Sequence, residues 1–499
     1  MFKGRIHRVR LKDLLPEIAL VATTLAAAFA LRLFAATLAG VEVDEPIYQY
    51  AAAYTVRYGF PTIRATYGQP TVPFLYHPPF FFFLLAGWFR LFNTTDFFTA
   101  RMLSVITSLV MLVLLYSFVR VALGKSVALL TLLLVGSDVW VIFTNQAVYI
   151  ENSQMILILL AMWAYWAATR VEATNNRRYV LSYLVAGLLV GAVIAYKQIG
   201  VFLAIAILIN LCLQRKHWLA HLYLFLVAGT VVVGYLVYMH AAFGGLFDTE
   251  TFTQLRRTLG ARSSPGLNYG PLTALGAVAS TYWVFVTTIL ALVGGSILVI
   301  MRTVQKVMGK RQEADTLFLS WALGGVAFAL GIALKSPHYL ILWLIPLYIV
   351  ISAELVRVYK HLPVRRQKVA MPVFLVCVLL INLWSFQARF LDLPGDTLAQ
   401  ADTYINATLP ATAIVATENY IGVDITRAYV NIAVLTTPKK LFYSGATYAA
   451  FYWSETEPLP AAFGNINQFC IPLKTFNGFK DHVEVCQIDR GKLAQDFTR

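Results

Sequence analysis

The feature that most constrains this chain is a series of apolar runs, each long enough to cross the roughly 30 Å hydrocarbon core of a bilayer. Hydrophobic residues make up 59% of its 499 residues and charged residues only 13%, which excludes an ordinary soluble globular protein. Hydropathy predicts about eleven membrane helices in an all-α polytopic protein. The predicted helices are Glu17–Leu38, Leu103–Val121, Val127–Phe143, Asn152–Ala168, Tyr179–Ala195, Ile199–Leu213, Leu219–Met239, Leu272–Met301, Thr316–Leu334, Tyr339–Val358 and Val369–Gln387.

Basic residues are concentrated in alternate loops between these runs, beginning with the N-terminal MFKGRIHRVRLK. Cytoplasmic loops carry an excess of Lys and Arg, so we expect the N-terminus inside and, with an odd number of helices, the segment after Gln387 outside. The net charge of +15 is then a signal of topology, and no nucleic acid partner is needed to explain it. The first run lacks a small-residue cleavage site, so we expect no cleaved signal peptide. The predicted location is the plasma (inner) membrane.

The outer face is predicted to carry a large first loop, residues 40–101, and a C-terminal domain, residues 391–499, which follows a membrane domain of residues 1–390. The tail is more polar than the rest of the chain. In it, ADTYINATLP has the pattern of an amphipathic helix ended by Pro410, and ATAIVATE that of a strand. These patterns predict a small α/β domain. Cys470 and Cys486 both lie there, and on the oxidising side of a membrane they either pair or stay free.

The first outer loop opens on two adjacent carboxylates in apolar surroundings, in the stretch VEVDEPIYQY. Asp44 and Glu45 precede apolar residues at helical spacing, which predicts a short amphipathic helix along the membrane surface. Farther on, Phe80–Phe92 is too short to span comfortably and reads as an interfacial or re-entrant piece. An aromatic belt accounts for the phenylalanines. It does not account for two carboxylates and His77 beside a proline pair.

Taken in order, these residues resemble the GT-C glycosyltransferases, in particular the branch of the dolichyl-phosphate-mannose protein mannosyltransferases and the lipid A aminoarabinose transferases. The resemblance covers roughly the first 390 residues. Its matching stretches are Leu31-Arg32-Leu33, Asp44-Glu45 with Tyr50 and Ala51, Gly59-Phe60-Pro61, Tyr76-His77-Pro78-Pro79-Phe80, Ala100-Arg101-Met102-Leu103, Ala195-Tyr196-Lys197, and Ser336-Pro337-His338-Tyr339 leading to Pro346.

The resemblance implies transfer of a sugar, with inversion, from a polyprenyl-phosphate donor to a hydroxyl acceptor on the outer face. It makes Asp44 the general base, and the chemistry agrees, because inversion needs a carboxylate opposite the leaving phosphate to take the acceptor's proton. Glu45 either supports this base or is a solvated structural carboxylate. Cationic or hydrogen-bonding groups must receive the developing phosphate charge. Lys197 is the first candidate, with a snorkelling lysine as the alternative.

Other residues have weaker assignments. Relatives in the aminoarabinose branch carry Glu-Lys where this chain has Tyr76-His77, which weakens lipid A as the acceptor and leaves His77 as a phosphate ligand or a packing residue. Further candidates for the phosphate are Arg101, His338 and Tyr339, with an interface anchor as the default for Arg101. Arg32, inside the first helix, is expected to pair with Asp44, Glu45 or Glu151. Glu151 is either a helix N-terminal charge or a second carboxylate of the site.

The sequence shows no metal-ligand spacing and no nucleotide-binding fingerprint, so we predict neither a metal nor another cofactor. The expected partners are the lipid-linked donor, the hydroxyl acceptor of a protein, lipid or glycan, and the bilayer. A transporter or flippase of lipid-linked sugars is the main alternative, although the chain has no internal repeat and its polar residues gather in outer loops. A noncatalytic relative that binds glycans is a third hypothesis.

Overall fold

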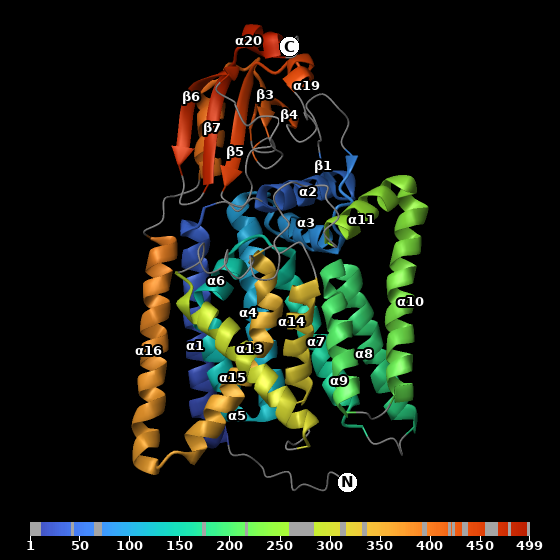
Figure 1. The fold of residues 1–499 in the computed structure, drawn as a ribbon, viewed down its shortest axis with the longest axis vertical. Coiled ribbons are helices and arrows are strands. Elements are labelled where there is room, and N and C mark those ends of the chain that lie inside the picture. The colour runs from blue at the N-terminus through green and yellow to red at the C-terminus, as the bar shows by residue number, and fades with distance from the viewer. Residues whose placement is uncertain are drawn as a thin grey trace.

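The structure is a computed structural model of the chain (Figure 1). It describes residues 11–40, 44–63, 72–171, 176–214, 218–258, 284–309, 316–331, 337–391, 397–417, 421, 425–431, 438–454, 468–477 and 481–496. Its two parts are a helical bundle and a smaller α/β unit stacked on one end of that bundle.

Every predicted membrane run contains a helix. The bundle helices are α1 (Leu11–Leu38), α4 (Phe97–Leu123), α5 (Lys125–Ser137), α6 (Val139–Gln146), α7 (Ile150–Ala168), α8 (Asn176–Tyr196), α9 (Val201–Gln214), α10 (Trp218–Phe243), α13 (Val286–Val307), α14 (Thr316–Gly331), α15 (Ile341–His361) and α16 (Val364–Phe390). Within the described ranges, seven helices are long and apolar enough to cross a membrane, or eight if one bent pair forms a single span. The chain is an integral membrane protein, and the number of eleven spans stays a prediction, because this count rests on the length and composition of the described helices only.

The predicted helix Val127–Phe143 is wrong in one respect, because it is broken between α5 and α6, whose axes differ by 63°. The break lies at Asp138, whose carboxylate accepts a hydrogen bond from the backbone N–H of Val141 and so caps α6. The same buried side chain accepts hydrogen bonds from the hydroxyl groups of Thr288 and Tyr348, at 2.8 and 2.6 Å. These contacts fix the corner from two other helices, α13 and α15. The corner sends the chain into α6 and the turn that begins α7.

A layer of short elements crosses the end of the bundle beneath the α/β unit (Figure 1). It consists of α2 (Asp44–Tyr58), α3 (Phe80–Phe92), α11 (Gly245–Thr258) and the two-stranded pair β1 (Thr62–Ile63) and β2 (Val72–Pro73). The two helices predicted for the first outer loop are therefore confirmed. α2 buries Tyr48, Ala51, Ala52 and Thr55, which recur at helical spacing, against the rest of the molecule. This buried face holds the first turn of α2 over the bundle.

The up-and-down connectivity places several helix ends beneath this layer. α1 ends there, α4 and α7 begin there, and α8 ends there before the single turn η1 (Gln198–Gly200) leads into α9. The turn η3 (Pro337–Leu340) precedes α15 at the same end. Residues far apart in sequence therefore meet at one end of the bundle.

The C-terminal unit is a mixed five-stranded sheet covered by helices on both faces. Its elements are α17 (Thr397–Thr408), β3 (Ile414–Thr417), β4 (Ala428–Asn431), α19 (Pro438–Tyr443), β5 (Tyr448–Ser454), β6 (Cys470–Asn477), β7 (Asp481–Ile488) and α20 (Arg490–Asp496), with strand order β4-β3-β5-β7-β6. β3 pairs in parallel with β4 and β5, whereas β7 pairs antiparallel with β5 and β6. The predicted tail helix and strand are both present, as α17 and β3.

Side chains along the strands point alternately to the two faces of the sheet, and each face has its own apolar core. Val415 packs on the side of α17, and the next residue, Ala416, packs on the side of α19 and α20. Adjacent strand residues point to opposite faces, so each strand serves both cores. Each face of the sheet therefore buries apolar side chains against its own helices.

Of the two alternatives left open for the tail cysteines, the structure shows the paired one. Cys470 and Cys486 form a disulfide at the edge of the sheet, with their Cα atoms 5.5 Å apart. It joins β6 and β7 across a sequence separation of 16 residues. A crosslink of that span restricts the unfolded chain.

We expect the Cys470→Ser/Cys486→Ser variant to lose about 3 kcal/mol of stability in the C-terminal unit, the value for a loop of this length. Limited proteolysis of the full-length protein in detergent measures this as faster cleavage within residues 397–496. Cys212→Ser is the matched control, because Cys212 is a free, exposed cysteine. Equal cleavage rates in all proteins would contradict the expectation.

Candidate active site

A buried group of charges lies where α7, α8 and α15 approach the layer formed by α2, α3 and α11. Lys197 is 3% exposed, Glu151 is fully buried, and Lys197 Nζ forms an ion pair with Glu151 Oε1. The same carboxylate oxygen lies 3.5 Å from Nε2 of His338. Of the two hypotheses for Glu151, these contacts favour a carboxylate of the site, because a helix N-terminal charge would need no cation. Lys197 is thus held inside the protein and does not snorkel.

The backbone fixes Lys197 at a break in its helix. α8 ends at Tyr196, Lys197 is extended, and η1 follows. The carbonyl oxygen of Lys197 accepts a hydrogen bond from Nε2 of Gln154, at 3.0 Å. A Cβ atom on Gly200 would lie 2.6 Å from the carbonyl oxygen of Val193, so only glycine permits this close return of the chain. The gap between the predicted helices Tyr179–Ala195 and Ile199–Leu213 therefore corresponds to a real interruption.

Aromatic rings surround this charged group. Tyr339 places its ring 5.1 Å from Lys197 Nζ, a cation–π distance. His338 stacks on Tyr149 at 4.4 Å between ring centroids and meets Tyr339 edge-on. The rings keep the group partly dry, which strengthens its electrostatic interactions.

Glu45 anchors the first turn of α2 to the bundle. Its carboxylate accepts hydrogen bonds from Arg101 Nε and Nη2, at 3.1 and 2.7 Å, and from the backbone N–H of Val148, at 2.7 Å. Arg101 also donates to carbonyl oxygens at the end of α1, those of Ala36, Ala39 and Gly40. These contacts favour an orienting role for Glu45, and they commit the guanidinium of Arg101 to protein partners. Asp44, the neighbouring residue, is thereby held at the start of α2.

We expect Glu45→Ala to destabilise the protein by about 3–5 kcal/mol, because it leaves the buried guanidinium of Arg101 without its carboxylate. The measurement is thermal unfolding in detergent. Asp248→Asn is the control, because its ion pair with His240 is more than half exposed on both sides and such pairs contribute about 0–1 kcal/mol. A Glu45→Ala protein as stable as the control would disprove the anchoring role.

Tyr48 and His77 connect the first turn of α2, which carries Asp44 and Glu45, to the part of the site around Lys197. The Tyr48 hydroxyl and His77 Nε2 lie 2.9 Å apart in a hydrogen bond. Burial, the Asp44 carboxylate and the Glu151 carboxylate raise the pKa of Tyr48 well above its usual value, so the phenol keeps its proton. Burial and the nearby Lys197 ammonium hold the pKa of His77 well below 6.5. His77 is therefore a neutral hydrogen-bonding group at pH 7, not a cation.

The predicted carboxylate partner of Arg32 is wrong. Arg32 is fully buried, and its guanidinium donates two hydrogen bonds to Asn145 Oδ1 and one each to the carbonyl oxygens of Ala28 and Gly136. Its described contacts include none of the three predicted partners, Asp44, Glu45 and Glu151. Polar oxygens along the α5–α6 corner satisfy the cation instead, so Arg32 braces that corner.

Tyr76 lies beside His77, with ring centroids 5.0 Å apart, and stacks on Phe74. It belongs to a group of aromatic rings with Phe74 and His77. Within the described residues, no three His, Cys, Asp or Glu side chains come together as a metal site.

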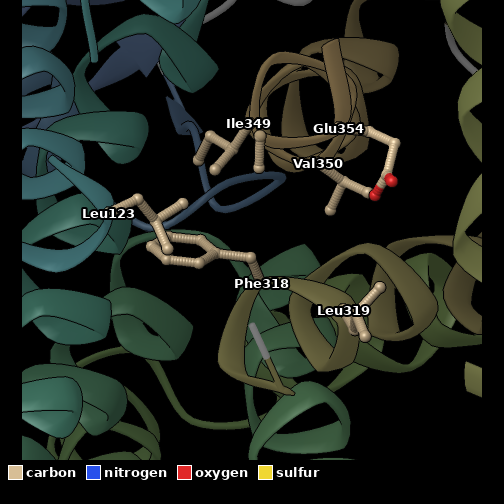
Figure 2. A pocket seen from close by; sticks show the side chains of 7 residues that line it. Leu123, Phe318, Leu319, Ile349, Val350 and Glu354 are labelled. Atoms are coloured by element: carbon tan, nitrogen blue, oxygen red, sulfur yellow. The ribbon is translucent and has the colours of Figure 1, made fainter. Parts of the chain in front are cut away.

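A small cavity lies between the C-terminal end of α4 and the helices α14 and α15 (Figure 2). Its lining residues are Leu123, Phe318, Leu319, Ile349, Val350, Ala353 and Glu354. The lining is apolar except for Glu354, which is engaged by Arg302 and Arg357. None of the predicted site residues lines this cavity, so it is separate from the charged group.

Comparison with solved structures identifies the architecture. ArnT from Cupriavidus metallidurans, in the apo state, superposes with a TM-score of 0.62 at 12% identity, covering 94% of this chain and 98% of that one. Its structure bound to undecaprenyl phosphate gives a TM-score of 0.61. The chain has the GT-C fold. The oligosaccharyltransferase AglB from Archaeoglobus fulgidus, in complex with an inhibitory peptide and a dolichol-phosphate, gives 0.59 at 12% identity, covering 86% of this chain and 69% of that one.

A family model agrees with the GT-C fold over part of the chain. The model described as dolichyl-phosphate-mannose-protein mannosyltransferase matches residues 76–239. That range runs from the residue before His77 to near the end of α10, and so contains Glu151 and Lys197 but not Asp44. No curated protein sequence matches. The resemblance to GT-C glycosyltransferases inferred from the sequence is confirmed.

Sequence reasoning missed two members of this site. Tyr48 lies four residues after Asp44 and hence on the same face of α2, which is a signal that helical spacing could have supplied. Tyr149 immediately precedes α7 and stacks on His338, and no local pattern indicates that contact.

Proposed function

We propose that the protein is a glycosyltransferase that moves a sugar from a polyprenyl-phosphate donor to a hydroxyl acceptor at the outer face of the membrane, with inversion. The observation that carries the proposal is a carboxylate and a buried lysine within electrostatic reach of one hydrogen-bonded pair. Burial and the Asp44 carboxylate raise the pKa of Tyr48, and burial and the Lys197 ammonium lower the pKa of His77. Tyr48 and His77 are joined by a hydrogen bond. The GT-C fold supports the donor class, because ArnT of that fold has been solved with undecaprenyl phosphate.

In this proposal the two sides of the site have complementary roles. Asp44 takes the proton of the acceptor hydroxyl as its oxygen attacks the anomeric carbon. Lys197 receives the negative charge that develops on the phosphate as the glycosidic bond breaks, in surroundings of low polarity where such an interaction is strong. Glu45 and Arg101 position the first turn of α2. Tyr48 and neutral His77 donate and accept hydrogen bonds without adding charge.

The proposed active site lies on the extracytoplasmic side, with the C-terminal unit above it. Support comes from the distribution of basic residues in the sequence and from the position of the sheet over α2 and α3 in Figure 1. A unit at the mouth of the site is well placed to select the acceptor. Residues 391–499 are therefore proposed as the acceptor-facing domain.

The test is to incubate the purified protein with a panel of labelled polyprenyl-phosphate sugars and follow release of the lipid phosphate. We expect one member of the panel to be turned over. Movement of labelled donor across vesicles without bond cleavage would favour the flippase instead.

A further inference from the structure

The ion pair between Lys197 and Glu151 raises a question of charge. On the proposed function, which this inference extends, Lys197 binds the phosphate of the donor. Yet in the structure its ammonium group is already occupied by Glu151 Oε1, and both side chains are buried. A phosphate oxygen bound to this cation must either share the three N–H donors of the ammonium with that oxygen or replace it. The carboxylate is then left beside a second negative charge.

His338 is the group that can resolve this conflict. Its Nε2 lies 3.5 Å from the same Oε1 of Glu151, and its ring is fixed by stacking on Tyr149. Histidine is the side chain whose protonation a neighbouring negative charge can most readily change near neutral pH. Among the described residues, the other ionisable side chains around Glu151 and His338 are Lys197, His77 and the phenols of Tyr48, Tyr149, Tyr196 and Tyr339. A phenol cannot supply a positive charge.

We infer that, without donor, the Glu151 carboxylate occupies the position on Lys197 that the donor phosphate takes. Donor binding then moves this carboxylate from Lys197 to a protonated His338. The phosphate takes the place of Glu151 Oε1 on Lys197 Nζ. The imidazole of His338 takes one proton from solvent and donates its Nε2–H to Glu151. The binding site is thus proton-coupled, for a ligand of the phosphodiester class.

The charges balance in both states. Without ligand, ammonium and carboxylate cancel while the imidazole is neutral. With a singly charged phosphodiester bound, two cations face two anions. Without the proton, the buried group would carry a net negative charge, which is costly away from water. The other oxygen of Glu151, Oε2, is buried and has no hydrogen-bond partner among the described residues, so it can accept the new contact.

The experiment uses undecaprenyl methyl phosphate, a diester with one fixed charge and no sugar. Its binding to the full-length protein in detergent is followed by titration calorimetry in two buffers of different ionisation enthalpy. We expect uptake of about one proton per lipid, and a Kd that rises up to about tenfold per pH unit between about pH 6 and 8. His338→Asn and His338→Gln should bind with little proton uptake and a nearly constant Kd.

His240→Asn is the matched control, because His240 is an exposed histidine whose described carboxylate contact is Asp248, away from the site. It should behave as the native protein does. Binding without proton uptake by the native protein would overturn the inference and leave the proposed donor class intact. If neither this diester nor undecaprenyl phosphate binds, the donor class itself is wrong and the inference falls with it.

Discussion

Asp44→Asn should lower the rate of sugar transfer by about 10²–10⁴-fold, the usual contribution of a general base. The amide keeps the size and hydrogen-bonding shape of the side chain but cannot accept a proton. The anchor formed by Glu45 and Arg101 is untouched, so α2 should stay in place and lipid binding should change by less than about threefold. The measurement is single-turnover release of labelled sugar, with binding of undecaprenyl phosphate measured in parallel.

Asp96→Asn is the matched control for this experiment. Asp96 lies in the same loop, residues 40–101, but its carboxylate caps α4 by accepting a hydrogen bond from the backbone N–H of Thr99, at 2.8 Å. Asparagine caps helices about as well as aspartate, so transfer should be unchanged. Full activity in Asp44→Asn would remove the general base from the proposal and favour a noncatalytic, glycan-binding protein.

Most of the helices could be predicted from the sequence because burial in a bilayer demands long apolar runs. The break at Asp138 could not be predicted, because a hydropathy average over a run of residues does not detect the capping hydrogen bond that bends the chain. The number of spans stays a prediction for a related reason. α9 and α14 are apolar but short, and an apolar helix packed inside a bundle has the same composition as one that crosses lipid.

Individual site residues were easier to predict than their partners. Asp44, Glu45, Lys197 and His338 were all singled out, and the structure brings them to the same end of the bundle. Their pairing depends on contacts across more than forty positions of sequence, as between Glu151 and Lys197. Three carboxylates were predicted as possible partners of Arg32. In the structure its guanidinium donates to the amide oxygen of Asn145 instead. Charge alone does not choose a partner when neutral oxygens lie closer.

The second large effect concerns Lys197. We expect Lys197→Met to weaken binding of undecaprenyl phosphate by about 30-fold or more, because removing one member of a buried charge pair costs about 2–5 kcal/mol. The methionine keeps most of the apolar stem, so packing against Tyr339 is largely retained. The same change should destabilise the protein by about 3–5 kcal/mol, since Glu151 loses its ion-pair partner. Binding and thermal unfolding are measured on the same preparation.

The double variant Lys197→Met/Glu151→Gln separates these two effects. It removes both charges, so the buried group is neutral again and most of the lost stability should return. Phosphate binding should not return, because no ammonium group is present to receive it. If the double variant binds the lipid as well as the native protein, Lys197 is a structural partner of Glu151, and the phosphate must be held by other groups.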